Sequence, residues 1–234
     1  VTAVVELKAR FDEEQNINWA EELERAGVNV VYGFAGLKIH AKLCLVVRRE
    51  PKGMRRYAHI GTGNYNASSA KIYTDLGLFT ARDDICSDVQ DLFNVMTGFG
   101  VIDNYRRIFV SPNHLRANIT RLIREEAEIH RAKGGGRIIM KCNQLVDQGI
   151  VRELYEASRA GVKIECVVRG ICSLRPGIKN VSETISVHSI VGELLEHARI
   201  YYFEHGGEPV MYVGSADMMT RNLNGRIEVL TPVL

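Results

Sequence analysis

An internal repeat limits the fold of this chain more than any other feature of its sequence. A strand–helix–strand pattern runs through residues 1–8, roughly 13–26 and 28–31, and returns at 137–140, roughly 147–159 and 162–168. The tetrapeptide Arg-Ala-Gly-Val closes the helix in both copies, at 25–28 and at 159–162. This order of elements predicts an α/β fold with a mixed or parallel sheet. The simplest architecture for such a duplication is two similar domains that face each other.

Each copy later carries a histidine followed two positions on by a cation. These pairs are His40 with Lys42 and His197 with Arg199, and both are predicted to lie on strands, where residues i and i+2 face the same side. Each pair is followed by a strand that ends in a small turn, Ile60-Gly61-Thr62-Gly63-Asn64 in one copy and Val213-Gly214-Ser215-Ala216-Asp217 in the other. Eleven residues after Asn64 stands Asp75, and eleven after Asp217 stands Glu228.

A histidine beside a fixed cation is suited to phosphate chemistry. The cation disfavours imidazolium, which leaves a neutral nucleophile. The ring nitrogen can then attack phosphorus while the cation neutralises the developing oxygen charge. Two such units predict one nucleophile and one partner that acts as an acid or as a hydrogen-bond donor. The remaining histidines are predicted to be structural or solvent-facing: His59, His114, His130, His188 and His205.

The domain boundary is predicted near 105–115, which divides the chain into residues 1–107 with His40 and residues 108–234 with His197. Residues 115–133 form a charged amphipathic pattern, predicted to be a packing helix. Gly134-Gly135-Gly136 lacks the Lys-Ser/Thr pair that marks a phosphate loop and is predicted to be a turn.

Charge and cysteine content set further limits. The net charge is +2 over 234 residues, so an anion site must come from local clusters of Arg and Lys. The five cysteines include no Cys-x-x-Cys pair and are predicted to be buried thiols in a reducing cytosol. No apolar run approaches the ~20 residues of a membrane span, and we expect no signal peptide. The chain starts without Met inside an apolar run and ends abruptly, so we expect it to be a fragment of a longer protein.

The paired histidine motifs resemble those of the phospholipase D superfamily. The usual motif of that family has an Asp a few residues after the Lys, whereas the run from Leu43 to Val47 is apolar. This departure argues against an ordinary phosphodiesterase.

The sequence resembles the bacterial polyphosphate kinase family more closely, over essentially the whole chain. In the first half the matching runs are Val5 to Glu14, Gly36 to Lys42, Ile60 to Asn66 and Tyr73 to Gly77. In the second half they are Val168 to Cys172, Leu195 to His197, Ser215 to Asn222 and Arg226 to Val229.

The resemblance implies two similar phospholipase D-like domains, each with a mixed, mostly parallel sheet flanked by helices. It implies reversible transfer of the ATP γ-phosphate to inorganic polyphosphate through a phosphohistidine on His40, with ATP/ADP as substrate and Mg²⁺ as cofactor. His197 resembles the second active-site histidine, which contacts the nucleotide phosphates, and Tyr73 and Arg169 match ATP-binding positions. Lys42, Arg199 and Asn64 are the further expected phosphate-binding residues.

Arg10 matches a position at the magnesium–phosphate end of the site. Because an arginine cannot ligate a cation, we expect it to grip phosphate oxygens that also bind Mg²⁺. The resemblance also implies a homo-oligomer for the full-length enzyme, a cytoplasmic location compatible with a peripheral position at the inner membrane, and no nucleic-acid partner. Upstream domains that the family uses for the nucleotide base and for dimerisation are missing, so we expect weak or no turnover by the 234-residue chain.

One stretch departs from the family, because Ser186, His188 and Glu193 stand where basic residues are expected. Two rival functions stay open. A phospholipase D-type phosphodiesterase or nuclease shares the paired histidines and would need no ATP. A non-catalytic module that binds polyanions would be indicated by a basic stripe with interleaved aromatics.

Overall fold

The computed structural model describes residues 1–7, 13–34, 36–100 and 104–233. The second half of the chain contains the larger sheet, with seven strands in the order β11-β10-β9-β13-β14-β16-β8. Strands β11, β10 and β9 run parallel, and the other neighbours pair antiparallel. The strands are β8 (Phe109–Val110), β9 (Arg137–Cys142), β10 (Lys163–Val168), β11 (Ile185–His188), β13 (Arg199–Phe203), β14 (Val210–Gly214) and β16 (Val229–Pro232).

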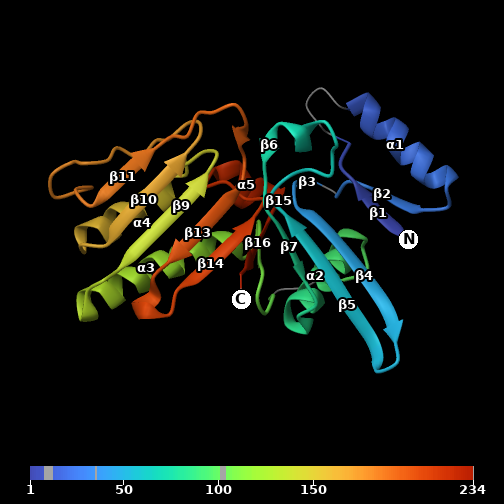
Figure 1. Ribbon diagram of the computed structural model, residues 1–234, viewed down its shortest axis with the longest axis horizontal. Coiled ribbons are helices and arrows are strands. Elements are labelled where there is room, and N and C mark those ends of the chain that lie inside the picture. Colours follow the sequence, from blue (N-terminus) through green and yellow to red (C-terminus); the bar gives the residue numbers. More distant parts are fainter. Residues whose placement is uncertain (8–12, 35, 101–103, 234) are drawn as a thin grey trace.

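Helices α3 (Leu115–Lys133) and α4 (Gln148–Arg159) pack against each other and against this sheet (Figure 1). Helix α4 begins where the Asp147 side chain accepts a hydrogen bond from the Ile150 N–H, at 3.1 Å. Its apolar stripe of Ile150, Leu154 and Ala157 is buried in the core. The prediction that Gly134–Gly136 is a turn is confirmed, because Gly134 and Gly135 have positive φ angles after the end of α3.

The first half of the chain repeats the order of elements on a smaller scale. Strands β1 (Thr2–Val5) and β2 (Asn29–Tyr32) pair parallel and are connected through α1 (Glu13–Arg25). Strands β4 (Lys42–Glu50), β5 (Gly53–Gly61) and β7 (Gly77–Thr80) form an antiparallel sheet, with α2 (Asp83–Met96) packed against it. The β4–β5 hairpin projects away from the centre of the molecule (Figure 1).

Two short strand pairs join the halves. Strand β3 (Lys38–Ile39) pairs with β15 (Arg226–Ile227), and β6 (Tyr73–Thr74) pairs with β12 (Leu195–Glu196). The remaining helical segments are α5 (Thr220–Gly225) and two short 3₁₀ turns, η1 (Ser69–Lys71) and η2 (His205–Gly207). Because each bridge takes one strand from each half, the two halves meet at the centre of the molecule (Figure 1).

The α/β class and the repeated strand–helix–strand units are confirmed, but two predictions are wrong. His40 lies between β3 and β4, and His197 lies between β12 and β13, so neither is inside a strand. At each of these positions the backbone leaves its own sheet and forms hydrogen bonds with the opposite half. All five cysteines are free, but Cys44 is exposed, because the face of β4 that carries it is uncovered. In the described part of the chain, no helix has the length and apolar character that crossing a membrane requires.

Candidate active site

Main-chain hydrogen bonds hold each histidine against the opposite half. The N–H groups of His40 and Ala41 both donate to the Ile227 carbonyl, at 2.9 and 3.0 Å. The N–H groups of His197 and Ala198 donate to the Thr74 carbonyl, at 3.3 and 3.0 Å. Each histidine therefore lies at the junction of the two halves, next to the end of a short strand pair, and Lys42 and Arg199 act on the pKa of both.

Each half also supplies a carboxylate that contacts the histidine of the other half. His40 Nδ1 lies 2.8 Å from Glu228 Oε2, and His197 Nδ1 lies 2.8 Å from Asp75 Oδ1. Each imidazole is thus oriented by a carboxylate from the other half. A carboxylate at Nδ1 favours the tautomer with the proton on Nδ1. The Nε2 lone pair of His40 is then free, whereas Nε2 of His197 lies 3.2 Å from Arg199 Nη1 and accepts from it.

The small turns of the sequence repeat hold these carboxylates. Glu228 is fully buried and accepts hydrogen bonds from Ser215 Oγ at 2.6 Å and Asn222 Nδ2 at 2.5 Å. Thr62 Oγ1 donates to Asp75 Oδ1 at 2.6 Å. Thr62 and Ser215 follow Gly61 and Gly214, so the hydroxyl of each Gly-Thr/Ser turn positions the carboxylate of its own half.

The two predicted cations are buried. Lys42 is 6% exposed and donates to the His40 carbonyl. Burial lowers the pKa of Lys42 to about 7, so its amine is easily neutralised when no anion is present. Arg199 is 2% exposed and donates to Asp217 Oδ2 at 3.1 Å, the Thr62 carbonyl at 3.1 Å and the His197 carbonyl at 2.9 Å. Arg199 is therefore fixed by protein groups behind the histidines.

Both imidazoles are biased toward the neutral form. Burial lowers the pKa of His40, and Lys42 and Arg199 lower it further, while Glu228 opposes them. Burial and then Arg199 lower the pKa of His197 to about 4, against the effect of Asp75. The cations thus act in the direction that the sequence predicts, although burial is the larger cause.

The predicted nucleotide residues gather around His197. The Tyr73 ring lies 4.7 Å from the His197 ring, centroid to centroid, at an interplanar angle of 42°. Arg169 Nη1 donates to the Glu196 carbonyl at 3.0 Å, which holds the arginine next to that histidine. Tyr73 and Arg169 are both partly buried.

His40 also lines a groove with a volume of about 650 Å³. This groove also contains Lys42 and the exposed Asn64, together with Arg226 and Lys38 of the β3–β15 pair. Lys38, Lys42 and Arg226 outnumber the one carboxylate among the described residues that line the groove, Glu6, so the groove has an excess of basic groups that suits a phosphate chain. Arg10, the remaining predicted phosphate-binding residue, lies outside the described residues.

No three His, Cys, Asp or Glu side chains converge as a metal site within the part of the chain that the structure describes. Asp75 and Glu228 are engaged with the histidines. The described residues therefore offer no carboxylate cage for Mg²⁺, which prefers oxygen ligands.

Comparison with known families identifies the chain. Residues 108–234 match the model of the polyphosphate kinase C-terminal domain 2, and residues 1–102 match that of the polyphosphate kinase C-terminal domain 1. The chain belongs to the polyphosphate kinase family.

Curated relatives in this family are similar over the whole chain. The polyphosphate kinase of Synechocystis is 56% identical over 234 residues, which are 100% of this chain and 32% of that protein. Polyphosphate kinase 1 of Chlorobaculum tepidum is 56% identical over 233 residues, 100% of this chain and 33% of that protein. The crystal structure of polyphosphate kinase from Porphyromonas gingivalis has a TM-score of 0.89 at 40% identity, covering 100% of this chain and 38% of that one. The chain thus spans about a third of the length of these members of the polyphosphate kinase family.

Asp75 and Glu228 are not among the site residues that the sequence predicts, although each lies 2.8 Å from a predicted histidine in this member of the polyphosphate kinase family. Their equal spacing from Asn64 and Asp217 was the available signal. That spacing marks equivalent positions in the repeat, but it does not indicate that each carboxylate serves the histidine of the other half.

Proposed function

We propose that this chain carries the phosphotransfer centre of a polyphosphate kinase. The reaction is reversible transfer of the γ-phosphate of ATP to the end of a polyphosphate chain through a phosphohistidine on His40. The observation that supports it best is the Glu228–His40 hydrogen bond at 2.8 Å, which frees Nε2 beside Lys42 and the cationic groove.

In the first half-reaction, His40 Nε2 attacks the γ-phosphorus in line. The bond between that phosphorus and its bridging oxygen breaks, and ADP leaves with the electron pair. In the second half-reaction, a terminal oxygen of polyphosphate attacks the same phosphorus, and the N–P electron pair returns to Nε2. Glu228 stabilises the positive charge that the ring carries while the N–P bond exists.

Two residues distinguish the histidines. His40 lines the groove, whereas His197 lies beside Tyr73 and Arg169, where we place the nucleotide phosphates. Because the pKa of His197 is lowered to about 4, its ring is neutral near pH 7 before phosphate binds. To donate a hydrogen bond from Nε2 to the leaving oxygen, His197 would take up a proton as the anion enters, which raises its pKa, and would give up the contact of Nε2 with Arg199 Nη1.

Lys42 and Arg199 are proposed to act on the phosphate groups in different ways. Lys42 and Asn64 line the groove and are proposed to contact phosphate directly. Arg199 is hydrogen-bonded to Asp217, Thr62 and His197, so its proposed contribution is a fixed positive field as well as the position of His197. Mg²⁺ would neutralise nucleotide phosphate oxygens, and we derive no step through it.

The decisive experiment replaces His40 with Ala in the enzyme that carries this chain and incubates it with γ-labelled ATP. We expect the acid-labile phosphoenzyme and polymer synthesis both to disappear. A His130→Ala variant is the matched control. His130 is on α3, does not line the groove, and accepts a hydrogen bond from the Gly136 N–H at 2.9 Å. Full labelling of the His40→Ala protein would refute the proposal. Hydrolysis of a phosphodiester without ATP would instead favour the phospholipase D-type rival.

A further inference from the structure

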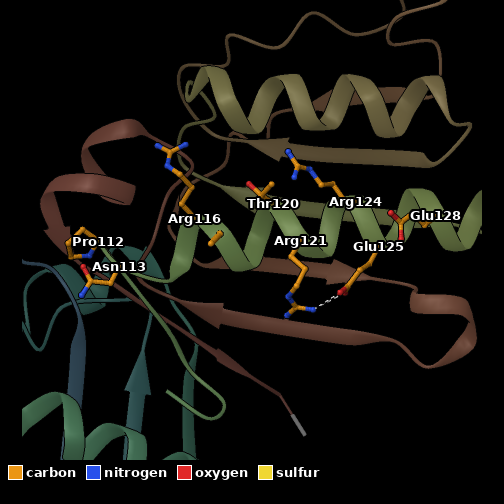
Figure 2. A pocket seen from close by; sticks show the side chains of 9 residues that line it. Pro112, Asn113, Arg116, Thr120, Arg121, Arg124, Glu125 and Glu128 are labelled. Atoms are coloured by element: carbon orange, nitrogen blue, oxygen red, sulfur yellow. Dashed lines mark hydrogen bonds and ion pairs between the residues drawn. The ribbon is translucent and has the colours of Figure 1, made fainter. Parts of the chain in front are cut away.

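Two pockets lie along α3, and only the second contains an arginine without a carboxylate partner among the described residues. The groove in Figure 2 contains Arg116, Arg121 and Arg124, but these pair with Asp147, Glu125 and Glu153 at 2.7, 2.8 and 2.5 Å. Its positive charge is thus compensated. Arg121 points to the opposite side of the helix from Arg116 and Arg124 (Figure 2), where it reaches a second and smaller pocket.

This second pocket, which we term the junction pocket, has a volume of about 330 Å³ and lies where the two halves of the chain join. No acidic side chain lines it among the described residues. It is lined by aromatic, basic and apolar residues: Tyr105, Arg106, Arg107, Phe109, Asn118, Arg121, Pro209, Val210, Met211, Tyr212, Pro232 and Val233.

An aromatic shelf forms one wall of the junction pocket. The Tyr212 ring stacks on the buried Phe109 ring, with centroids 4.5 Å apart and an interplanar angle of 26°. Phe109 fixes the orientation of Tyr212, which is partly buried and keeps one side toward the pocket. A rigid aromatic ring of this kind is a platform for a flat ligand such as a nucleobase.

Three guanidinium groups surround this shelf. Arg107 and Arg121 both lie close enough to Tyr212 to oppose the rise in its pKa that burial causes. Both are ion-paired, Arg107 with Asp84 at 2.9 Å and Arg121 with Glu125 at 2.8 Å. Arg106 is exposed, and no described residue accepts a hydrogen bond from its guanidinium. The backbone of residues 106–108 is fixed, because the N–H groups of Arg106, Arg107 and Ile108 donate to the buried Asp88 carboxylate at 3.0, 2.6 and 3.1 Å.

We propose that the junction pocket binds a nucleoside monophosphate, with the base on Tyr212 and the phosphate on Arg106, the one of its three arginines that has no carboxylate partner among the described residues. Its volume lies at the lower end of the range of about 300–1,000 Å³ for small-ligand sites, which suits one nucleotide rather than a polymer. Polyphosphate would use Arg106 but gain nothing from the aromatic shelf. The site goes beyond the proposed phosphotransfer and does not depend on it.

The pocket is separate from the histidines but joined to them by two strands. Tyr212 and Pro232 are register partners on β14 and β16. The same strands lead at their other ends to Ser215 and Glu228, the pair that orients His40. A nucleotide in the junction pocket would thus contact the strands that position Glu228 without touching the reacting groups.

Calorimetric titration of the 234-residue chain with AMP, adenosine and ribose 5-phosphate tests the proposal. We expect AMP to bind at least tenfold more tightly than either partial ligand, because only AMP uses both the shelf and Arg106. Arg106→Gln and Tyr212→Leu should each weaken this binding at least tenfold. Arg152→Gln, at an exposed arginine of α4, is the matched control and should not change it.

Arg169→Gln separates this site from the candidate active site and should leave junction-pocket binding intact. The thermal midpoint of each variant shows whether it is folded, and the exposed Arg106 keeps the test valid if Tyr212→Leu does not fold. AMP binding that Arg169→Gln removes and Arg106→Gln leaves unchanged would overturn the proposal. Equal affinity for AMP and ribose 5-phosphate would also overturn it, because the base would then make no contact.

Discussion

Among single residues, Glu228 tests the proposed chemistry most directly. A Glu228→Gln substitution keeps the size of the side chain, but an amide can donate to His40 Nδ1 and thereby favour the tautomer that carries its proton on Nε2. The nucleophile is then blocked, and we expect His40 phosphorylation by labelled ATP to slow by about 10²–10⁴-fold, as for a carboxylate that orients a catalytic histidine. Single-turnover labelling measures this rate. The exposed Glu208→Gln is the matched control and should not change the rate. A Glu228→Gln rate within threefold of the parent would show that tautomer control is unimportant.

Lys42 gives a prediction about pH. Its pKa is lowered to about 7 by burial, so it is positive below that pH and largely neutral above it. Only the positive form attracts phosphate, so affinity for tripolyphosphate should fall as pH rises from 7 to 9, by up to about tenfold per unit for one linked proton. A Lys42→Arg variant stays charged and should lose this dependence. Dissociation constants measured across pH 6–9 would contradict the prediction if the two proteins gave parallel curves.

At the level of elements, Gly214 at the end of β14 is required by close packing. A Cβ there would lie 2.0 Å from the Val229 carbonyl oxygen of β16, next to Glu228. Gly214→Ala should therefore force the strands apart and lower the free energy of unfolding by about 3 kcal/mol or more. Gly225→Ala is the control, since its Cβ would meet nothing within 4 Å. Urea denaturation measures both, and equal midpoints for the two variants would count against this packing argument.

The elements that sequence predicts well are those with local causes. Helix α3 was predicted over 115–133 and spans Leu115–Lys133, because its apolar stripe and its terminal glycine are both visible in the sequence. The two-residue strands β3 and β15 carry no such signal, since they pair only after the halves dock. The same reason explains which neighbours of the two histidines could be predicted. The His-x-basic repeat predicted Lys42 and Arg199 near them, whereas the exchange of Asp75 and Glu228 depends on long-range docking.

At the scale of the whole molecule, the first half does not complete its own hydrophobic core. The cluster around α2 includes Ile108, Val110, Ile227 and Val229, all beyond the proposed boundary at residue 107. At about 1.5–3 kcal/mol for each buried aliphatic side chain, these four contribute roughly 6–12 kcal/mol. That equals the whole stability of a typical domain, about 5–15 kcal/mol. The core of the second half, by contrast, consists of residues between Phe109 and Leu230.

We therefore expect the two proposed domains to behave differently when they are produced separately. Residues 108–234 should unfold cooperatively in urea, while residues 1–107 should show no cooperative transition, because removal of the four aliphatic side chains uncovers α2 and the sheet of β4, β5 and β7. Mixing the two pieces should restore structure to the first, since the β3–β15 and β6–β12 pairs can form again. Circular dichroism during titration of one piece with the other measures this gain. A cooperative transition for residues 1–107 alone would mean that the shared core is dispensable. In that case the exchanged carboxylates at His40 and His197 would be the main link between the halves.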